Sequence, residues 1–160
     1  MRAVVLLAAF LAACAQVEIK PPEGPLEFSL AGRIAARSGK ESFTGNIAWR
    51  HAPNGDELLI STPTGQGVAQ IVRQGDAVLL RTSEPREYRA ADSEELTERV
   101  LGFRLPIAGL AEWVQGRPAP ELESRGWRIE YQDHDAQRRP TRLRLTNAGA
   151  EVRLAIHQWN

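Results

Sequence analysis

The chain has 160 residues with 20 basic and 20 acidic side chains, so its formal net charge is zero. It contains one cysteine, which excludes an internal disulfide and the metal sites that need several cysteines. The neutral charge argues against a domain-wide electrostatic grip on nucleic acid, so we expect neither a nucleic-acid partner nor a cofactor. The length suits one globular domain with its own core.

The first residues have the pattern of an export signal. A short basic start, Met1-Arg2, precedes an apolar run over residues 3–13. This run is too short for a transmembrane helix, which needs about 20 apolar residues. The sequence Leu11-Ala12-Ala13-Cys14 resembles a bacterial lipobox, in which cleavage before the cysteine frees that residue for lipidation. We therefore predict that residues 1–13 are a lipoprotein signal peptide and that Cys14 is the lipidation site.

Two simpler interpretations of Cys14 stay open. Ala13-Cys14-Ala15 also fits the pattern of ordinary signal cleavage, and a lone cysteine is often a small buried hydrophobe. A triacylated cysteine would be a durable anchor, since stable anchoring takes two or more membrane signals. Ala15 rather than an aspartate after the cysteine indicates sorting to the outer membrane. We expect a lipid-anchored protein on the periplasmic face of that membrane.

Residues 14–27 are predicted to be a lipidated tether that leaves the folded body free to turn. The run Lys20-Pro21-Pro22-Glu23-Gly24-Pro25 contains prolines that block a helix and a glycine that interrupts a strand. The folded domain is therefore expected over residues 28–160.

From residue 28 onward apolar and polar side chains alternate, which predicts half-buried strands. The first two, over residues 28–36 and 43–50, are joined by a short turn and should form a hairpin. Further strands follow at about ten-residue spacing with turns between them, as expected of an antiparallel sheet or barrel. They are predicted over residues 57–62, 66–74, 77–82, 126–133, 141–146 and 151–159.

Two helices are predicted in the middle of the chain. Asp92 stands in an N-cap pattern, apolar residues follow at helical spacing, and Gly102 ends that helix. The second is expected from Leu105-Pro106, with Gly116 just past its end.

These elements predict a mainly β fold with inserted helices, in which a strongly curved antiparallel sheet of eight or more strands is apolar inside and polar outside. The two helices should cover its open side. An interior of this size holds either its own packed side chains or one small ligand. The alternation alone leaves a packed core and a cavity both open.

Several segments resemble the outer-membrane lipoprotein receptor family LolB. They are Phe28-Ser29-Leu30-Ala31-Gly32-Arg33-Ile34, Ser42-Phe43-Thr44-Gly45-Asn46-Ile47-Ala48-Trp49, Leu105-Pro106-Ile107 with Leu110, Trp113-Val114-Gln115-Gly116, Gly126-Trp127 with Tyr131, and Trp159. They occur in order over residues 28–159, behind the lipobox. The resemblance implies an unclosed antiparallel barrel covered by a helical lid, with an apolar cavity that accepts the acyl chains of other lipoproteins.

The resemblance also implies partners and a site. A periplasmic carrier, LolA, would hand over lipoprotein cargo, and this chain, as a monomer, would insert the cargo into outer-membrane lipid. We expect twelve apolar residues of the inward faces and of the second helix to line the cavity. They are Phe43, Ile47, Trp49, Leu58, Ile60, Ile107, Leu110, Trp113, Leu143, Leu145, Leu154 and Ile156.

The family carries an exposed apolar residue, commonly leucine, on the loop between the third and fourth strands, which acts in membrane insertion. The aligned loop here is Pro63-Thr64-Gly65, so threonine stands where leucine is expected. Either Pro63 and the Thr64 methyl group suffice, or Val68 supplies the apolar surface, or this chain inserts cargo less efficiently.

Catalytic interpretations find little support, and we expect no enzyme. The histidines are His51, His134 and His157, and no motif links them to a nucleophile. Asp133-His134-Asp135 is the best metal candidate, but neighbouring strand residues point to opposite faces, which favours a solvated turn. No metal site is therefore predicted.

Two alternatives remain. The basic run Arg138-Arg139 with Arg142 and Arg144 either meets lipid head groups or an acidic carrier rim, or is an ordinary solvated strand face. The whole protein could instead be a structural envelope lipoprotein with a packed barrel core that transfers no cargo.

Overall fold

The structure is a computed structural model that describes residues 18–160, except 85, 91, 103 and 106. The predicted signal peptide, Cys14 and Pro106 lie outside the described residues. Predictions about them therefore remain predictions.

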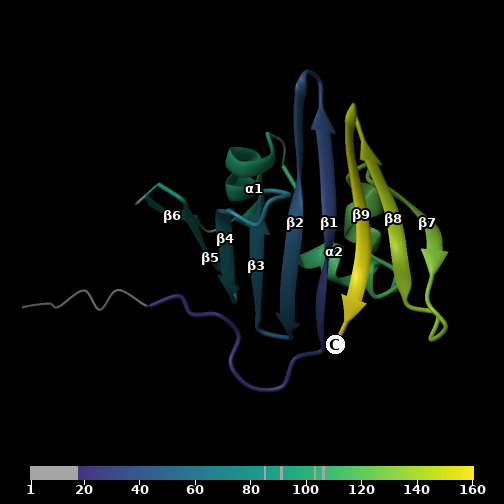
Figure 1. The fold of residues 1–160 in the computed structure, drawn as a ribbon, viewed down its shortest axis with the longest axis horizontal. Coiled ribbons are helices and arrows are strands. Elements are labelled where there is room, and N and C mark those ends of the chain that lie inside the picture. The colour runs from purple at the N-terminus through teal and green to yellow at the C-terminus, as the bar shows by residue number, and fades with distance from the viewer. Residues whose placement is uncertain (1–17, 85, 91, 103, 106) are drawn as a thin grey trace, which may run out of the picture.

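The described chain forms one nine-stranded antiparallel sheet (Figure 1). The strand order is β6-β5-β4-β3-β2-β1-β9-β8-β7, so β6 and β7 are the two edges and the sheet is not closed. The strands are β1 (Phe28–Ser38), β2 (Glu41–Ala52), β3 (Gly55–Ser61), β4 (Gly67–Gln74), β5 (Ala77–Thr82), β6 (Glu87–Ala90), β7 (Arg128–His134), β8 (Pro140–Asn147) and β9 (Ala150–Trp159). The predicted unclosed antiparallel half-barrel is confirmed.

The connection from β6 to β7 explains why helices cover the sheet. The first six strands follow one another as a meander to one edge, and the chain resumes at the opposite edge. It must cross one face of the sheet to get there, and it does so as α1 (Ser93–Leu101), α2 (Ile107–Val114) and α3 (Pro120–Ser124). Figure 1 shows the helices gathered on one face.

The predicted boundaries of α1 are confirmed by its caps. The Asp92 carboxylate accepts a hydrogen bond from the Glu94 backbone N–H at 2.8 Å, and Gly102 ends the helix with a φ of 80°. The short helix α3 is not predicted, because its five residues contain a single buried apolar side chain, Leu122. Within the part of the chain that the structure describes, no helix has the length and apolar character needed to cross a membrane.

The two faces of the sheet differ sharply. We call the face covered by the helices the inner face and the opposite one the outer face. On β1 the inner positions Phe28, Leu30 and Ile34 are buried, whereas Arg33 and Arg37 on the outer face are exposed. This is the alternation that the sequence predicts. The core therefore lies between the inner face and the helices.

Gly32 marks the place where β1 and β9 approach most closely. The register of the two strands shifts between Ala31 and Gly32. A Cβ atom at Gly32 would lie 2.2 Å from the Ala155 carbonyl oxygen, so only glycine fits this position.

Residues 18–27 form a segment without regular structure that we call the N-terminal strap. Its Ile19 is buried against Val72 and Leu79, which lie on the outer face of β4 and β5. The Lys20 backbone N–H donates to the Gln74 side chain at 3.4 Å. The prediction of a freely turning tether did not include this contact, which holds part of the segment against the sheet.

Candidate functional site

The twelve predicted cavity residues come together in one cluster between the inner face and the helices. They project from β2, β3, β8 and β9 on one side and from α2 on the other. Eleven of them are buried, and Phe43 is partly buried and packs against the rest. Sequence and structure thus agree on which side chains face inward.

These side chains are shielded from solvent by the sheet and the helices. Trp49 extends from β2 and Trp113 from α2, and both have exposed fractions of 1% or less. Ile107 and Val114 of α2 are fully buried as well. The described state is therefore one in which the helices are closed over a buried apolar core.

Several core residues are absent from the predicted set. Most occupy inner positions of predicted strands or apolar positions of the helices, so the same alternation would have found them. Trp127 alternates with Ile129 and Tyr131 in a predicted strand, whereas Leu122 had no periodic signal of its own. The further core members include Leu30, Ile34, Ile71, Leu80, Leu96, Leu105, Val114, Leu122, Trp127 and Val152.

A charged group lies buried at one end of this core. The Asp56 carboxylate is fully buried and accepts from Trp49 Nε1 at 2.8 Å and from Arg73 Nε at 2.6 Å. His51 Nδ1 lies 2.6 Å from the same carboxylate. Three neighbouring strands supply these residues, because the register places His51 opposite Asp56 and Asp56 opposite Arg73. The bonds satisfy a buried charge that would otherwise be costly.

The same end joins the strap to the helices. Phe28 stacks on His51 with ring centroids 4.9 Å apart. The Glu27 carboxylate lies 3.7 Å from His51 Nε2 and 3.4 Å from Arg117 Nη1, and Arg117 follows α2. Glu27 thus ties the first strand to the end of the second helix.

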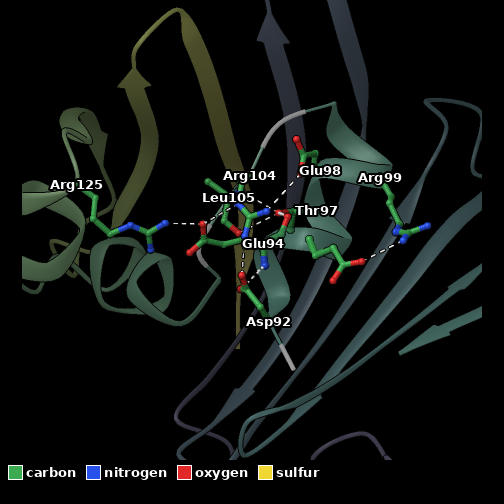
Figure 2. Close-up of polar contacts among 9 residues, drawn as sticks. Asp92, Glu94, Thr97, Glu98, Arg99, Arg104, Leu105 and Arg125 are labelled. Atoms are coloured by element: carbon green, nitrogen blue, oxygen red, sulfur yellow. Dashed lines mark hydrogen bonds and ion pairs between the residues drawn. The ribbon is translucent and has the colours of Figure 1, made fainter. Parts of the chain in front are cut away.

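A group of ion pairs fastens the helices to one another (Figure 2). The nearly buried Glu94 carboxylate of α1 accepts from Arg125 at the end of α3. Arg104, between α1 and α2, lies 2.7 Å from the Asp92 carboxylate and 3.5 Å from each of Glu94 and Glu98. The bond to Glu94 raises the pKa of the Arg125 guanidinium. We call this set, Asp92, Glu94, Glu98, Arg104 and Arg125, the lid clasp.

Thr97 supports the lid clasp from inside. Its buried hydroxyl accepts from the Leu105 backbone N–H at 2.8 Å and lies 3.0 Å from the Glu94 carbonyl oxygen. These bonds fix the chain after α1 against that helix. The helical lid is thus held as one unit by polar contacts that lie outside the apolar core.

The edge strand β7 also reaches the lid. The Tyr131 hydroxyl donates to the Trp113 carbonyl oxygen of α2 at 2.9 Å. Burial raises the pKa of this hydroxyl above its ordinary value. The bond connects one sheet edge to the middle of the lid.

The predicted insertion loop lies between β3 and β4, as expected. Pro63, Thr64 and Gly65 are exposed, and the Gly65 backbone N–H donates to the Thr62 carbonyl oxygen at 2.9 Å. The Thr64 hydroxyl lies 2.9 Å from that of Thr62. The loop is a tight turn with a threonine hydroxyl directed back onto itself. Val68 is half-buried and packs against the core.

The Asp133-His134-Asp135 run spans the end of β7 and the start of the turn that leads to β8. The Asp135 carboxylate accepts from the backbone N–H groups of Gln137 and Arg139 at 2.9 and 2.8 Å. Among the described residues no group of three metal-ligating side chains converges.

Comparisons with known proteins identify the family. The family model described as "Outer membrane lipoprotein LolB" matches residues 26–159. The outer-membrane lipoprotein LolB of Thiobacillus denitrificans is 37% identical, over 96% of this chain and 93% of that protein. The LolB of an Azoarcus species is 35% identical, over 94% and 90%.

A solved structure supports the fold independently. The LolA superfamily protein NE2245 from Nitrosomonas europaea superposes with a TM-score of 0.52 over 83% of this chain and 84% of that one. At 13% identity this likeness concerns the fold alone. The family match over the whole folded domain, together with the open sheet under a helical lid, leads to one conclusion: the chain belongs to the LolB family of outer-membrane lipoproteins.

Proposed function

We propose that this protein receives lipoproteins from a LolA-like periplasmic carrier and inserts them into the outer membrane. The observation that carries the proposal is the single apolar cluster between an unclosed sheet and a lid held by polar contacts. An acyl chain would enter where α2 now packs, between the inner strands and the lid. The protein would be anchored by lipid at Cys14 on the periplasmic face of the membrane.

The packed core is compatible with this role because the lid and an acyl chain are both apolar. Displacing the side chains of α2 exposes apolar surface, and an entering chain buries it again at about 0.8 kcal/mol per methylene group. The exchange needs no fixed polar contact to the chain, so it suits cargoes that share only their acylation. The lid clasp would keep the three helices together while they move.

Transfer of cargo in one direction requires only that the receptor and the carrier differ in their affinity for acyl chains. A receptor that holds acyl chains about 1.4 kcal/mol more tightly than the carrier is loaded tenfold more at equilibrium. Transfer into the bilayer follows, since a membrane buries all acyl chains of the cargo at once.

The loop of Pro63, Thr64 and Gly65 is proposed to contact the membrane during insertion. Thr64→Leu should raise the rate of cargo insertion into liposomes and Thr64→Glu should lower it, with loading from the carrier unchanged. Wild-type insertion rates in both variants would mean that the loop does not act in insertion. Thr64 would then have lost the role of the family's apolar loop residue.

The anchor has a direct test. Intact-mass analysis of protein extracted from membranes should give residues 14–160 with the increment of three acyl chains. An unmodified chain that starts at a different residue would contradict lipidation at Cys14.

An assay of cargo transfer distinguishes the proposed receptor from the alternative, a structural lipoprotein that transfers no cargo. Leu145→Trp and Leu110→Trp should each abolish transfer of an acylated lipoprotein from the carrier, because the added rings occupy the apolar cluster. Leu59→Trp, on the outer face, is the matched control and should transfer normally. Near-ultraviolet circular dichroism checks that each variant is folded. No transfer by the folded wild-type protein, or full transfer by both folded core variants, would favour the structural alternative.

A further inference from the structure

The outer face of β1, β8 and β9 carries a recess framed by arginines. Arg33, Arg142, Arg144 and Arg153 line a depression of about 490 Å³, and its lining includes no acidic residue. Its floor includes two alanines, Ala35 and Ala155. We call it the arginine recess.

The strand register explains the hollow. Ala155 lies directly opposite both Arg33 of β1 and Arg142 of β8, and Ala35 lies opposite Arg153. Small side chains therefore stand between long ones on the same face. The guanidinium groups surround a floor that stays open.

Two of the four charges in the recess have no acidic partner among the described residues. Arg33 and Arg142 have no ion-pair or hydrogen-bond partner among the residues that the structure describes. Arg144 and Arg153 share Glu151 at 2.6 and 2.9 Å, and Arg144 also lies 3.8 Å from Glu130. Arg144 also stands directly opposite Arg153, a like-charge pair that destabilises a sheet. A surface that keeps four arginines at this cost is suited to an anionic partner.

An apolar groove lies on the same face next to the recess. It has a volume of about 860 Å³, and the row Ala31, Ala48 and Leu59 crosses it on β1, β2 and β3. Leu59 is 44% exposed and is the one large apolar side chain classed as exposed within the described ranges. Ser61 and Gly67, which flank the loop of Pro63–Gly65, also line this groove. Positive charge and apolar surface thus adjoin one another.

The strap brings the start of the mature chain to this face. Ile19 packs on Val72 and Leu79, one row away from Leu59 on the outer face. Cys14 lies four positions before Glu18 in the sequence, and an extended chain covers at most about 14 Å in that length. A lipid anchor at Cys14 would therefore lie within about 14 Å of Glu18, next to the point where Ile19 packs on the outer face.

We propose that the outer face of the sheet docks on the membrane, with lipid phosphate groups in the arginine recess and Leu59 at the level of the head groups. Arginine suits this role because its planar donors bind phosphate oxygens in pairs. The inference goes beyond the proposed transfer function and uses it only for the anchor at Cys14. It orients the lid and the acyl-chain site away from the bilayer until cargo is inserted.

The test uses the chain with Cys14→Ser, which cannot be lipidated and contains no other cysteine. It is mixed with vesicles of phosphatidylethanolamine and phosphatidylglycerol and floated on a density gradient. Arg33→Gln with Arg142→Gln should weaken binding roughly 25-fold, at about fivefold per arginine near an anionic surface. The control removes the same charge elsewhere, by Arg86→Gln with Arg99→Gln, and should bind within about twofold of the parent.

A second readout identifies the face. In the same background Leu59→Cys and Ser124→Cys each carry an environment-sensitive fluorophore, the first on the outer face and the second on α3. Vesicles should shift the emission of the probe at 59 to the blue and leave that at 124 unchanged. Equal shifts, a shift at 124 alone, or equal losses of binding in the two double variants would overturn the proposal.

Two further arms identify the source of the anion. Millimolar inorganic phosphate should not release the protein from vesicles, because a membrane presents many phosphates together with apolar depth. Release by phosphate would reduce the recess to a site for the free ion. Polyglutamate that binds the parent and not the recess variant, while vesicle binding stays equal, would assign the recess to an acidic protein and overturn membrane docking.

Discussion

The two faces of the sheet differ in polarity and in burial, although the same strands form both. On the inner face nearly every position is apolar and buried, and α2 closes over it with Trp113 and Ile107. On the outer face most positions are polar, and the informative ones are exceptions such as Ala35, Ala155 and Leu59. The residues of the inner face are thus constrained by the packing of the core. The outer face is freer to vary, so its departures from a solvated surface are the better guide to interactions.

The largest effect is expected where a charge interrupts the inner face. Asp56→Asn leaves Arg73 and His51 without the carboxylate that they share, and breaking a buried pair costs about 3–5 kcal/mol of unfolding free energy. Urea denaturation followed by tryptophan fluorescence measures this loss. Asp76→Asn, in the exposed turn after β4, is the matched control and should change stability by less than about 0.5 kcal/mol. Similar midpoints for the two variants would contradict a structural role for the buried network.

Truncating one leucine on each face compares how much the two faces contribute to the free energy of unfolding. Leu143→Ala removes a fully buried inner side chain and should cost about 2–5 kcal/mol. Leu59→Ala removes an exposed outer one and should stay within about 0.5 kcal/mol. The same urea titration measures both. Equal costs would show that the division into a structural face and a free face is wrong.

The strap covers one part of the outer face, so this part should contribute to stability as the inner face does. Ile19→Ala exposes Val72 and Leu79 and should cost about 1.5–3 kcal/mol if the strap and sheet unfold together. Its neighbour Glu18, which is exposed, provides the control Glu18→Ala with little expected change. Limited proteolysis should cut the strap faster in the Ile19 variant alone. Unchanged cleavage would mean that the strap is not held by this contact.

The smallest effect concerns the lid clasp. Glu94→Gln weakens the bonds to Arg125 and Arg104, which are about half exposed, so the loss should be about 1 kcal/mol. Hydrogen exchange should become faster in α1 and α3 and stay unchanged in β8 and β9. Glu95→Gln, which removes an exposed pair with Arg99 within α1, should cost about 0.3–0.5 kcal/mol and leave α3 unaffected. Faster exchange throughout the sheet would mean that the clasp supports the whole core rather than the lid.

Local patterns account for the parts of the structure that the sequence predicts. Alternation over β1 and β2 identifies their buried sides, and Asp92 and Gly102 mark the ends of α1. Because each of these signals involves residues close in sequence, they can be interpreted without a structure. The twelve cavity residues came from this alternation combined with the family resemblance.

Features that depend on register could not be predicted in the same way. His51, Asp56 and Arg73 meet because three strands pair at particular offsets, and a shift of one residue would separate them. The alanines beneath the arginine recess become neighbours for the same reason. Ile19 gave no signal, since a single apolar residue before a proline-rich run has no periodicity. These are the places where tertiary structure adds information.

Site-specific photo-crosslinking can follow the exchange proposed above, in which acyl chains replace the lid against the inner face. A diazirine analogue of leucine is placed at position 145 on the inner face or at position 59 on the outer face. Each protein is then loaded in solution, without membranes, from a carrier that holds a lipoprotein with radiolabelled acyl chains. Radiolabel should be crosslinked to the protein with the probe at position 145 and should stay at background for the probe at position 59. Label at 59 alone, or at neither position after verified transfer of cargo, would contradict this exchange.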